Sequence, residues 1–174
     1  MIKIYTFNPV TIHWDIMTSL TGPNAGGNFG YSVALSGDGS RVAVGAPNHG
    51  NGLVRVYEYS DSTWTQIGSD LSGSAGGKFG WSVSLNNTGD YVTVGEPRKV
   101  FGVNTGVGEV HTFTFSGMDW SSESSKSFTN NQIEHQFGYA VDISSTNNVV
   151  VFGAPTAGPG YVKISSYISG NVPI

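Results

Sequence analysis

Short segments of alternating or continuous apolar residues, separated by polar turns, make up most of this 174-residue chain. Residues 2–7 and 54–59 alternate apolar with polar or amphipathic side chains, which predicts strands with one buried face. Residues 42–44 and 149–151 are apolar throughout, which predicts strands buried on both faces. Because no segment shows a convincing helical period, we expect an all-β fold of about 13 strands with essentially no helix.

One 19-residue pattern occurs three times without a gap, at residues 29–47, 79–97 and 137–155. Each copy begins with Phe-Gly and an aromatic residue, passes through a polar turn, and ends with Val-x-(Val/Phe)-Gly-x-Pro. This order predicts two strands joined by a tight turn. We expect the Phe ring to pack between neighbouring units and the Gly to allow close approach of the backbone, so the pattern is structural rather than catalytic.

Two further predicted strands follow each of the first two hairpins, which gives four antiparallel strands in about 40 residues, as in a propeller blade. Trp14, Trp64 and Trp120 lie 15, 15 and 17 residues before the next Phe-Gly. The N-terminal segment therefore corresponds to the third and fourth strands of a unit, and the third unit ends without a fourth strand. We expect one domain of about three and a half β-propeller-like repeats, with a half unit at 1–28 and units at 29–78, 79–136 and 137–174.

Composition narrows the classes of partner. Only 11% of the residues are charged, the formal net charge is -4, and no cluster of Lys or Arg is present, so we expect neither nucleic acid nor an anionic membrane as a partner. No apolar run is long enough for a membrane-spanning helix, and the first residues lack a signal-peptide pattern. The absence of Cys excludes disulfides, thiolate nucleophiles and Cys-based zinc sites.

The repeated motifs resemble the FG-GAP repeat, whose two ends are seen here at Phe29-Gly30 and Gly45-Ala46-Pro47. The resemblance extends over nearly the whole chain and is nearest to the variant common in bacterial and viral surface proteins. It implies a β-propeller, as in the seven-bladed head of integrin α subunits and in fungal lectins. It also implies binding of proteins, matrix or glycans through loops on one face.

Metal and cofactor chemistry is not expected. Calcium-binding members of the family carry an EF-hand-like run of Asp and Asn, whereas the turns here are short and offer at most one carboxylate each. The four histidines are spread along the chain without ligand spacing, and His111 is expected to be a packed or surface side chain. Glu96 replaces the Ala of Gly-Ala-Pro, and we expect it to be a surface substitution.

Three and a half repeats cannot easily close a ring, because propellers have 4 to 8 blades and an open one leaves exposed sheet edges. Two chains could combine into one ring, the chain could belong to a larger protein, or the N-terminal strand pair could associate with the C-terminal unit of the same or a neighbouring subunit. We favour assembly with copies of itself or with a larger structural scaffold.

The loops after each Gly-x-Pro are the expected binding elements, since loops vary and carry function. They span residues 48–52, 98–108 and 156–160, and the middle one combines an aromatic with polar side chains that suit a glycan or a cell-surface protein. A simple spacer role stays open, because insertions in surface loops cost little. The candidate ligand-binding residues are His49, Asn51, Arg98, Lys99, Phe101 and Asn104.

We therefore expect a non-enzymatic surface protein for adhesion or assembly, such as a virion-surface, fibre or capsid-decoration component, in an extracellular or virion setting. A lectin-like glycan-binding propeller is the alternative. A propeller hydrolase ranks third, because no nucleophile-and-base motif occurs. Two acidic residues facing each other across one pocket would favour the hydrolase.

Overall fold

The computed structural model describes residues 1–102, 106–122, 128–129, 135–146, 149–156 and 158–166. In this part of the chain there are fifteen strands, arranged in four antiparallel sheets, and no helix. Consequently it contains no helix with the length and apolarity needed to cross a membrane. The expectation of an all-β chain built from small antiparallel sheets is confirmed.

The first sheet is a two-stranded hairpin of β1 (Ile2–Asn8) and β2 (His13–Leu20), here called the N-terminal hairpin. Its Phe7 and Trp14 rings lie opposite each other with centroids 5.4 Å apart. The same aromatic pair closes the outer hairpins of the next two sheets, at 5.3 Å and 5.0 Å. The N-terminal hairpin thus has the form of the third and fourth strands of a sheet.

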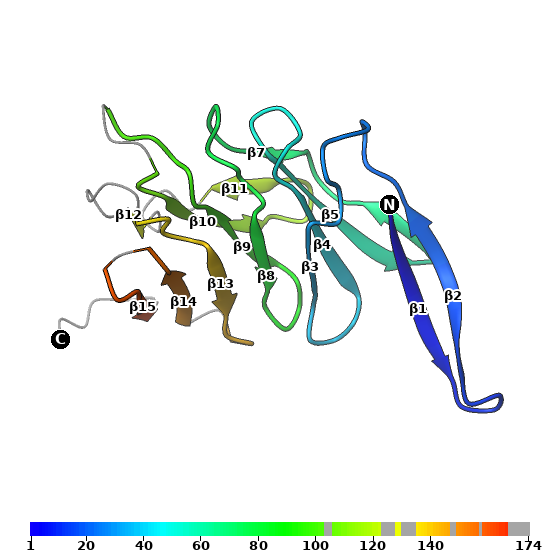
Figure 1. Cartoon of the computed structure of the whole chain (residues 1–174). Coiled ribbons are helices and arrows are strands. Elements are labelled where there is room, and N and C mark those ends of the chain that lie inside the picture. The colour runs from blue at the N-terminus through cyan, green and yellow to red at the C-terminus, as the bar shows by residue number, and fades with distance from the viewer. Residues whose placement is uncertain (103–105, 123–127, 130–134, 147–148, 157, 167–174) are drawn as a thin grey trace.

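The other three sheets are called blades 1, 2 and 3, and their first strands β3, β8 and β13 lie side by side (Figure 1). The N-terminal hairpin lies at one end of this row and blade 3 at the other (Figure 1). Blade 1 contains β3 (Ser32–Leu35), β4 (Arg41–Ala46), β5 (Leu53–Ser60), β6 (Thr63–Gln66) and β7 (Leu71–Ser72). Blade 2 contains β8 (Ser82–Leu85), β9 (Tyr91–Glu96), β10 (Glu109–Phe115), β11 (Trp120–Ser122) and β12 (Phe128–Thr129). Blade 3 contains β13 (Ala140–Ile143), β14 (Val149–Ala154) and β15 (Tyr161–Ser166).

The strand count exceeds the expected number because the fourth strand of blades 1 and 2 is divided. In blade 1, both β6 and β7 pair with β5, and Gly68 lies between them. Gly68 has a φ of +66°, and a Cβ there would lie 2.6 Å from the Trp120 ring. Only glycine satisfies both conditions, so the strand bends at this point and then resumes.

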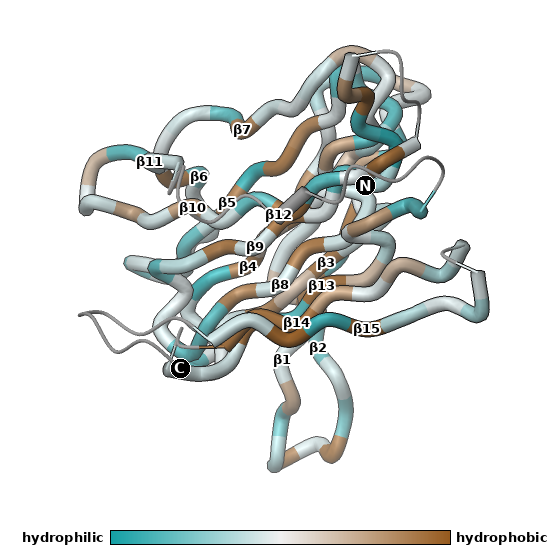
Figure 2. Tube along the Cα trace, turned by 90° about the vertical axis from the view of Figure 1, so that its left-hand side faces the viewer, coloured by the Kyte–Doolittle hydropathy of each residue, from teal (hydrophilic) through white to brown (hydrophobic). Residues whose placement is uncertain are grey.

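Apolar side chains fill the spaces between successive sheets. Three clusters form the core, one between each pair of neighbouring sheets. Apolar positions run along central strands such as β9 and β14 (Figure 2). The Phe of each Phe-Gly lies in one of these clusters and is buried, which confirms its expected packing between sheets.

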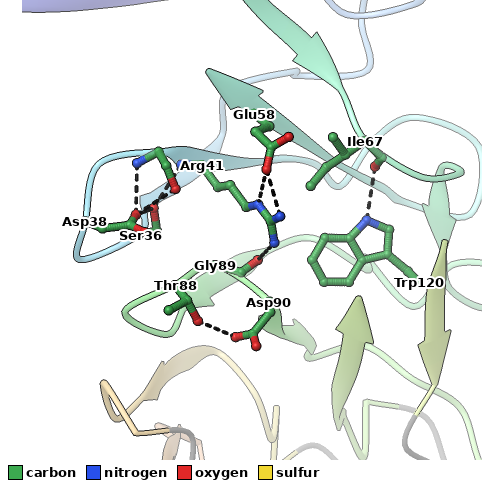
Figure 3. Close-up of polar contacts among 10 residues, drawn as sticks. Ser36, Asp38, Arg41, Glu58, Ile67, Thr88, Gly89, Asp90 and Trp120 are labelled. Atoms are coloured by element: carbon green, nitrogen blue, oxygen red, sulfur yellow. Dashed lines mark hydrogen bonds and ion pairs between the residues drawn. The ribbon is translucent and has the colours of Figure 1, made fainter. Parts of the chain in front are cut away.

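Polar contacts also join blades 1 and 2 (Figure 3). Arg41 Nε and Nη2 donate to Glu58 Oε1 at 2.9 Å and 2.7 Å, and its Nη1 donates to the carbonyl of Gly89 in blade 2 at 3.3 Å. The indole of Trp120 in blade 2 donates to the carbonyl of Ile67 in blade 1 at 3.1 Å. Charge-assisted and indole hydrogen bonds of this kind fix the relative position of the two sheets.

One expectation for the central strands is wrong in blade 3. Residues 42–44 of blade 1 are buried on both faces, as expected. In blade 3, Val149 is exposed and Val151 only partly buried, while Val150 between them is buried. The reason is that no further sheet covers the second face of blade 3 in the part of the chain that the structure describes.

Gly95 provides the first test of this stacking. A Cβ on Gly95 would overlap the backbone oxygen of Gly138 in the next blade, whereas a Cβ on the equivalent Gly153 has only the Ala140 Cβ nearby, at 3.9 Å. Gly95→Ala should therefore lower the free energy of unfolding by at least about 2 kcal/mol. Gly153→Ala should change it by less than about 1 kcal/mol. Urea unfolding monitored by tryptophan fluorescence measures both, and equal effects would contradict the close stacking of blades 2 and 3.

Candidate functional site

Each blade has an inner face turned toward the preceding sheet. The opposite, outer face is turned toward the next sheet in blades 1 and 2. Equivalent positions follow from the strand register, because the residue between Gly and Pro pairs with the same position of the third strand in every blade. These pairs are Ala46 with Leu53, Glu96 with Glu109, and Ala154 with Tyr161.

Among the described residues, none covers the outer face of blade 3 as the next blade covers that of blades 1 and 2. Val54 of blade 1 and Val110 of blade 2 are 0% exposed, whereas the equivalent Val162 of blade 3 is 68% exposed. The next outer-face position along each third strand shows the same contrast. The exposed fractions there are 1% for Val56, 3% for Thr112 and 70% for Ile164.

A cavity of about 490 Å³ lies on this open face. Its lining matches the residues that receive the Phe-Gly of the next blade elsewhere in the chain. In blade 1, Gly52 forms a backbone bridge to Phe79, and a Cβ on Gly45 would overlap the backbone oxygen of Gly80. We call the corresponding cavity of blade 3 the open socket. It is lined by Tyr139, Ala140, Gly153, Ala154, Pro155, Gly160, Tyr161 and Val162.

The inner face of blade 1 is only half covered. The N-terminal hairpin packs Ile2, Ile4 and Leu20 against the cluster on this face. Val33 and Leu35 on β3 nevertheless remain 56% and 58% exposed. Their equivalents in blades 2 and 3 lie against a preceding blade, and all of them are buried or half-buried: Val83, Leu85, Val141 and Ile143.

A row of aromatic rings crosses the three blades at the residue that follows each Phe-Gly. Tyr31 and Trp81 have ring centroids 4.7 Å apart, and Trp81 and Tyr139 are 5.4 Å apart. The two terminal rings are exposed and the central one is half-buried. Beside Trp81 and Tyr139 lies a cavity of about 180 Å³, which Pro97, Arg98 and Gln136 complete.

Blade 2 differs from its neighbours by a charged cluster at its inner face. Where blade 1 pairs Ala46 with Leu53, blade 2 pairs Glu96 with Glu109. Lys99 Nζ lies 3.1 Å from Glu109 Oε2 and 3.6 Å from Glu96 Oε2. The ammonium therefore lies between the two carboxylates and compensates their charge.

Glu96 is completely buried, so its expected surface position is wrong. His111 Nε2 lies 2.8 Å from Glu96 Oε2, and the hydroxyl and amide of Ser74 both donate to Glu96 Oε1. Gly73 and Gly77 lack the Cβ atoms that would fill the space taken by this carboxylate. The connector between blades 1 and 2 thus wraps around the Glu96 side chain and satisfies it.

The protonation of Glu96 follows from these contacts. Burial raises the pKa of its carboxyl, but the hydrogen bonds from His111 and Ser74 and the charge of Lys99 outweigh burial, so the pKa lies below its ordinary value. The carboxyl is therefore ionised at neutral pH. A bound cation could be held by Glu96, Glu109 and His111, whose ligand atoms lie within 4.8 Å of one another. Lys99 already supplies positive charge to both carboxylates.

The residues predicted from the loops are placed in two blades. His49 and Asn51 lie in the loop of blade 1, and His49 is half-buried against Gly27. Lys99 turns into the charged cluster, and its ammonium lies 5.8 Å from the centre of the Phe101 ring. Arg98 instead lines the cavity beside Trp81 and Tyr139, and Asn104 lies outside the described residues. Glycan binding at these loops stays a prediction.

Two features of the structure could not be predicted from the sequence. The charged cluster gives no signal in the 19-residue pattern, because Glu109, the cross-strand partner of Glu96, lies outside that pattern. Aligning the third strands as well as the first two would have shown acidic residues replacing an apolar pair. The exposed Val162 and Ile164 carry no sequence signal, because equally apolar residues are buried in blade 1.

No family model and no curated protein matches this chain. Solved structures show the fold. TolB from Acinetobacter baumannii matches with a TM-score of 0.54 at 16% identity, covering 97% of this chain and 36% of that one. Kuenenia stuttgartiensis hydrazine synthase matches with a TM-score of 0.55 at 11% identity, covering 94% of this chain and 40% of that one. Both are β-propeller proteins, so the chain has a propeller-like fold and spans about two fifths of their length.

Substitutions at the charged cluster distinguish the loss of one carboxylate from the replacement of both carboxylates by apolar side chains. Glu96→Ala removes the carboxylate that Lys99, His111 and Ser74 contact, and should lower the free energy of unfolding by about 3 kcal/mol. Adding Glu109→Leu recreates the apolar pair of blade 1, and should recover at least half of that loss. Urea unfolding at pH 7 measures both. A double variant less stable than Glu96→Ala would contradict this account.

The same variants have a defined pH dependence. Because the pKa of Glu96 is lowered by folding, its stabilisation is present above the ordinary carboxyl pKa and is lost as pH falls through the lower value in the folded protein. The stability gap between wild type and Glu96→Ala should therefore narrow below about pH 4.3. A gap that stays constant from pH 7 to pH 3 would contradict the ionised carboxylate.

Proposed function

We propose that this chain is a non-enzymatic assembly protein, an open row of propeller blades that joins copies of itself through its end faces. The observation that carries the proposal is the exposure of Val162 and Ile164, which are 68% and 70% exposed where equivalent residues are at most 3% exposed. A contiguous apolar sheet face of this kind marks an interaction surface. Covering it removes apolar area from water and protects the sheet.

The charged cluster supports a non-enzymatic role. A hydrolase needs two acidic groups that reach a substrate across one pocket. Glu96 is fully buried, and the Lys99 ammonium lies close to both Glu96 and Glu109. The cluster therefore favours a structural interpretation, in which charge compensation inside blade 2 holds the connector from blade 1 in place.

The proposed location of the protein is the exterior of a cell or virion. An assembly of rigid blades with low charge suits the exterior of a cell or virion, as a fibre, decoration or adhesion component. The loops after Gly-x-Pro would then face outward from the assembled blades and offer the surface for a glycan or a cell-surface protein.

The mass in solution tests this proposal. The monomer mass is 18.3 kDa, and sedimentation velocity of the wild type should show a larger, concentration-dependent mass. Val162→Asp places a charge on the open face and should weaken association at least about tenfold, because desolvating an unpaired charge is costly. Met118→Asp is the matched control, since Met118 is 86% exposed in the turn between β10 and β11 of blade 2, and it should associate like the wild type.

A wild type that stays at the monomer mass at every concentration would contradict the proposal. So would a Val162→Asp variant that assembles as readily as Met118→Asp.

A further inference from the structure

We propose that blade 3 docks onto blade 1 of a second copy. Phe29-Gly30 of the second copy then enters the open socket, and the N-terminal hairpin of the second copy leaves the inner face of its blade 1. This inference rests on the proposed function, in that it names the partner of the same open face. The association is head-to-tail, because two different faces of the chain meet.

The open socket has the shape of two sockets that are already filled. A Cβ on Gly80 would lie 3.0 Å from Val54 Cγ2, and a Cβ on Gly138 would lie 3.0 Å from Val110 Cγ2. The glycine of each Phe-Gly thus rests on the outer-face valine of the preceding blade. Val162 is that valine in blade 3, and the cavity of about 490 Å³ beside it provides the space for a Phe-Gly.

Phe29-Gly30 has the conformation that these sockets accept. Gly30 has a φ of +95°, close to +82° at Gly80 and +84° at Gly138. The residue that follows is aromatic in all three copies, so docking would place Tyr31 of the second copy beside Tyr139. Both tyrosines are exposed ends of the aromatic row, which would continue across the junction.

The second copy is the favoured occupant because the chain carries both complementary faces. Blade 3 offers an uncovered outer face, and blade 1 offers an inner face whose Val33 and Leu35 are more than half exposed. Three strands of blade 3 would cover both residues, which the two-stranded hairpin does not reach. The same contact, repeated from copy to copy, therefore covers both open faces of each chain.

The N-terminal hairpin competes for this place. A Cβ on Gly30 would lie 2.5 Å from Ile2 Cγ2, so Ile2 takes the position in front of blade 1 that Val162 would take after docking. The hairpin is weakly held, because a sheet of two strands is marginal by itself and most of its large side chains are exposed. It thus acts as a removable cap on blade 1.

One difference makes the open socket weaker than the filled ones. The Ser32 hydroxyl donates to the carbonyl of Gly80 at 2.8 Å, and the Ser82 hydroxyl donates to the carbonyl of Gly138 at 2.8 Å. Ala140 stands at this position in blade 3 and has no hydroxyl to donate. Ala140→Ser should therefore strengthen association.

Mixing two variants of the full chain tests the head-to-tail contact. Gly153→Ala blocks the open socket, since a Cβ at the equivalent Gly45 and Gly95 would overlap the backbone oxygen of the incoming glycine. Val33→Asp blocks the face of blade 1. Each variant alone should stay monomeric in sedimentation velocity, with association at least about tenfold weaker than that of the wild type. An equimolar mixture should form a 1:1 heterodimer, because the Gly153→Ala variant keeps the face of blade 1 and the Val33→Asp variant keeps the open socket. Ile2→Asp, which loosens the cap, should increase association several-fold.

The outcomes separate this inference from the proposed function. If Val162→Asp abolishes assembly but Val33→Asp assembles like the wild type, the chain still joins copies of itself, and blade 3 meets another surface of the second copy. If the mixture stays monomeric, or if Ile2→Asp does not raise association, the head-to-tail contact with release of the cap is overturned. Thermal unfolding checks that each variant is folded, since Val33 is exposed and Gly153 has space for a methyl group.

Discussion

The close approach of backbone to backbone between successive blades is the contact on which the structure depends. Gly45 and Gly95 are the penultimate residues of the second strands of their blades, and in each case the next blade places a carbonyl oxygen where a Cβ would be. Nothing larger than hydrogen fits at these positions, so the spacing of the blades is set by glycine and not by the bulk of the apolar side chains. The Phe of each Phe-Gly can then enter the core beside its glycine. The repeated motif is therefore a docking device, with the glycine on one blade and the Phe-Gly on the next.

Blade 2 shows that the same backbone accommodates a charged cluster in place of an apolar pair. Its inner face replaces an apolar cross-strand pair with Glu96 and Glu109, and the change requires several compensating groups. Lys99 and His111 approach the carboxylates, and Ser74 reaches Glu96 from the connector. A buried ion pair of this kind adds little net stability, but removing one member is costly. The cluster therefore ties the connector to blade 2 more specifically than an apolar pair would.

The repeat made the strands, their order and the burial of the Phe-Gly rings predictable from sequence. Turn residues and apolar alternation are local properties, and the structure confirms them. Two properties were not local. The burial of Glu96 depends on its partner across the sheet, and the exposure of Val162 depends on whether another sheet covers it. Val54 and Val162 have the same side chain and the same place in their blades, so only the assembled structure distinguishes them.

The central claim is that one outer-face position is covered in blades 1 and 2 and open in blade 3, and thiol labelling tests it most directly. The chain has no cysteine, so Val54→Cys, Val110→Cys and Val162→Cys each place a single thiol at this position. In dilute protein, the thiol at 162 should react about as fast as a free thiol, and those at 54 and 110 should react about a thousandfold more slowly, through unfolding. At concentrations where the chain associates, the thiol at 162 should become protected. A thiol at 162 that is as protected as the other two in the dilute monomer would contradict the account.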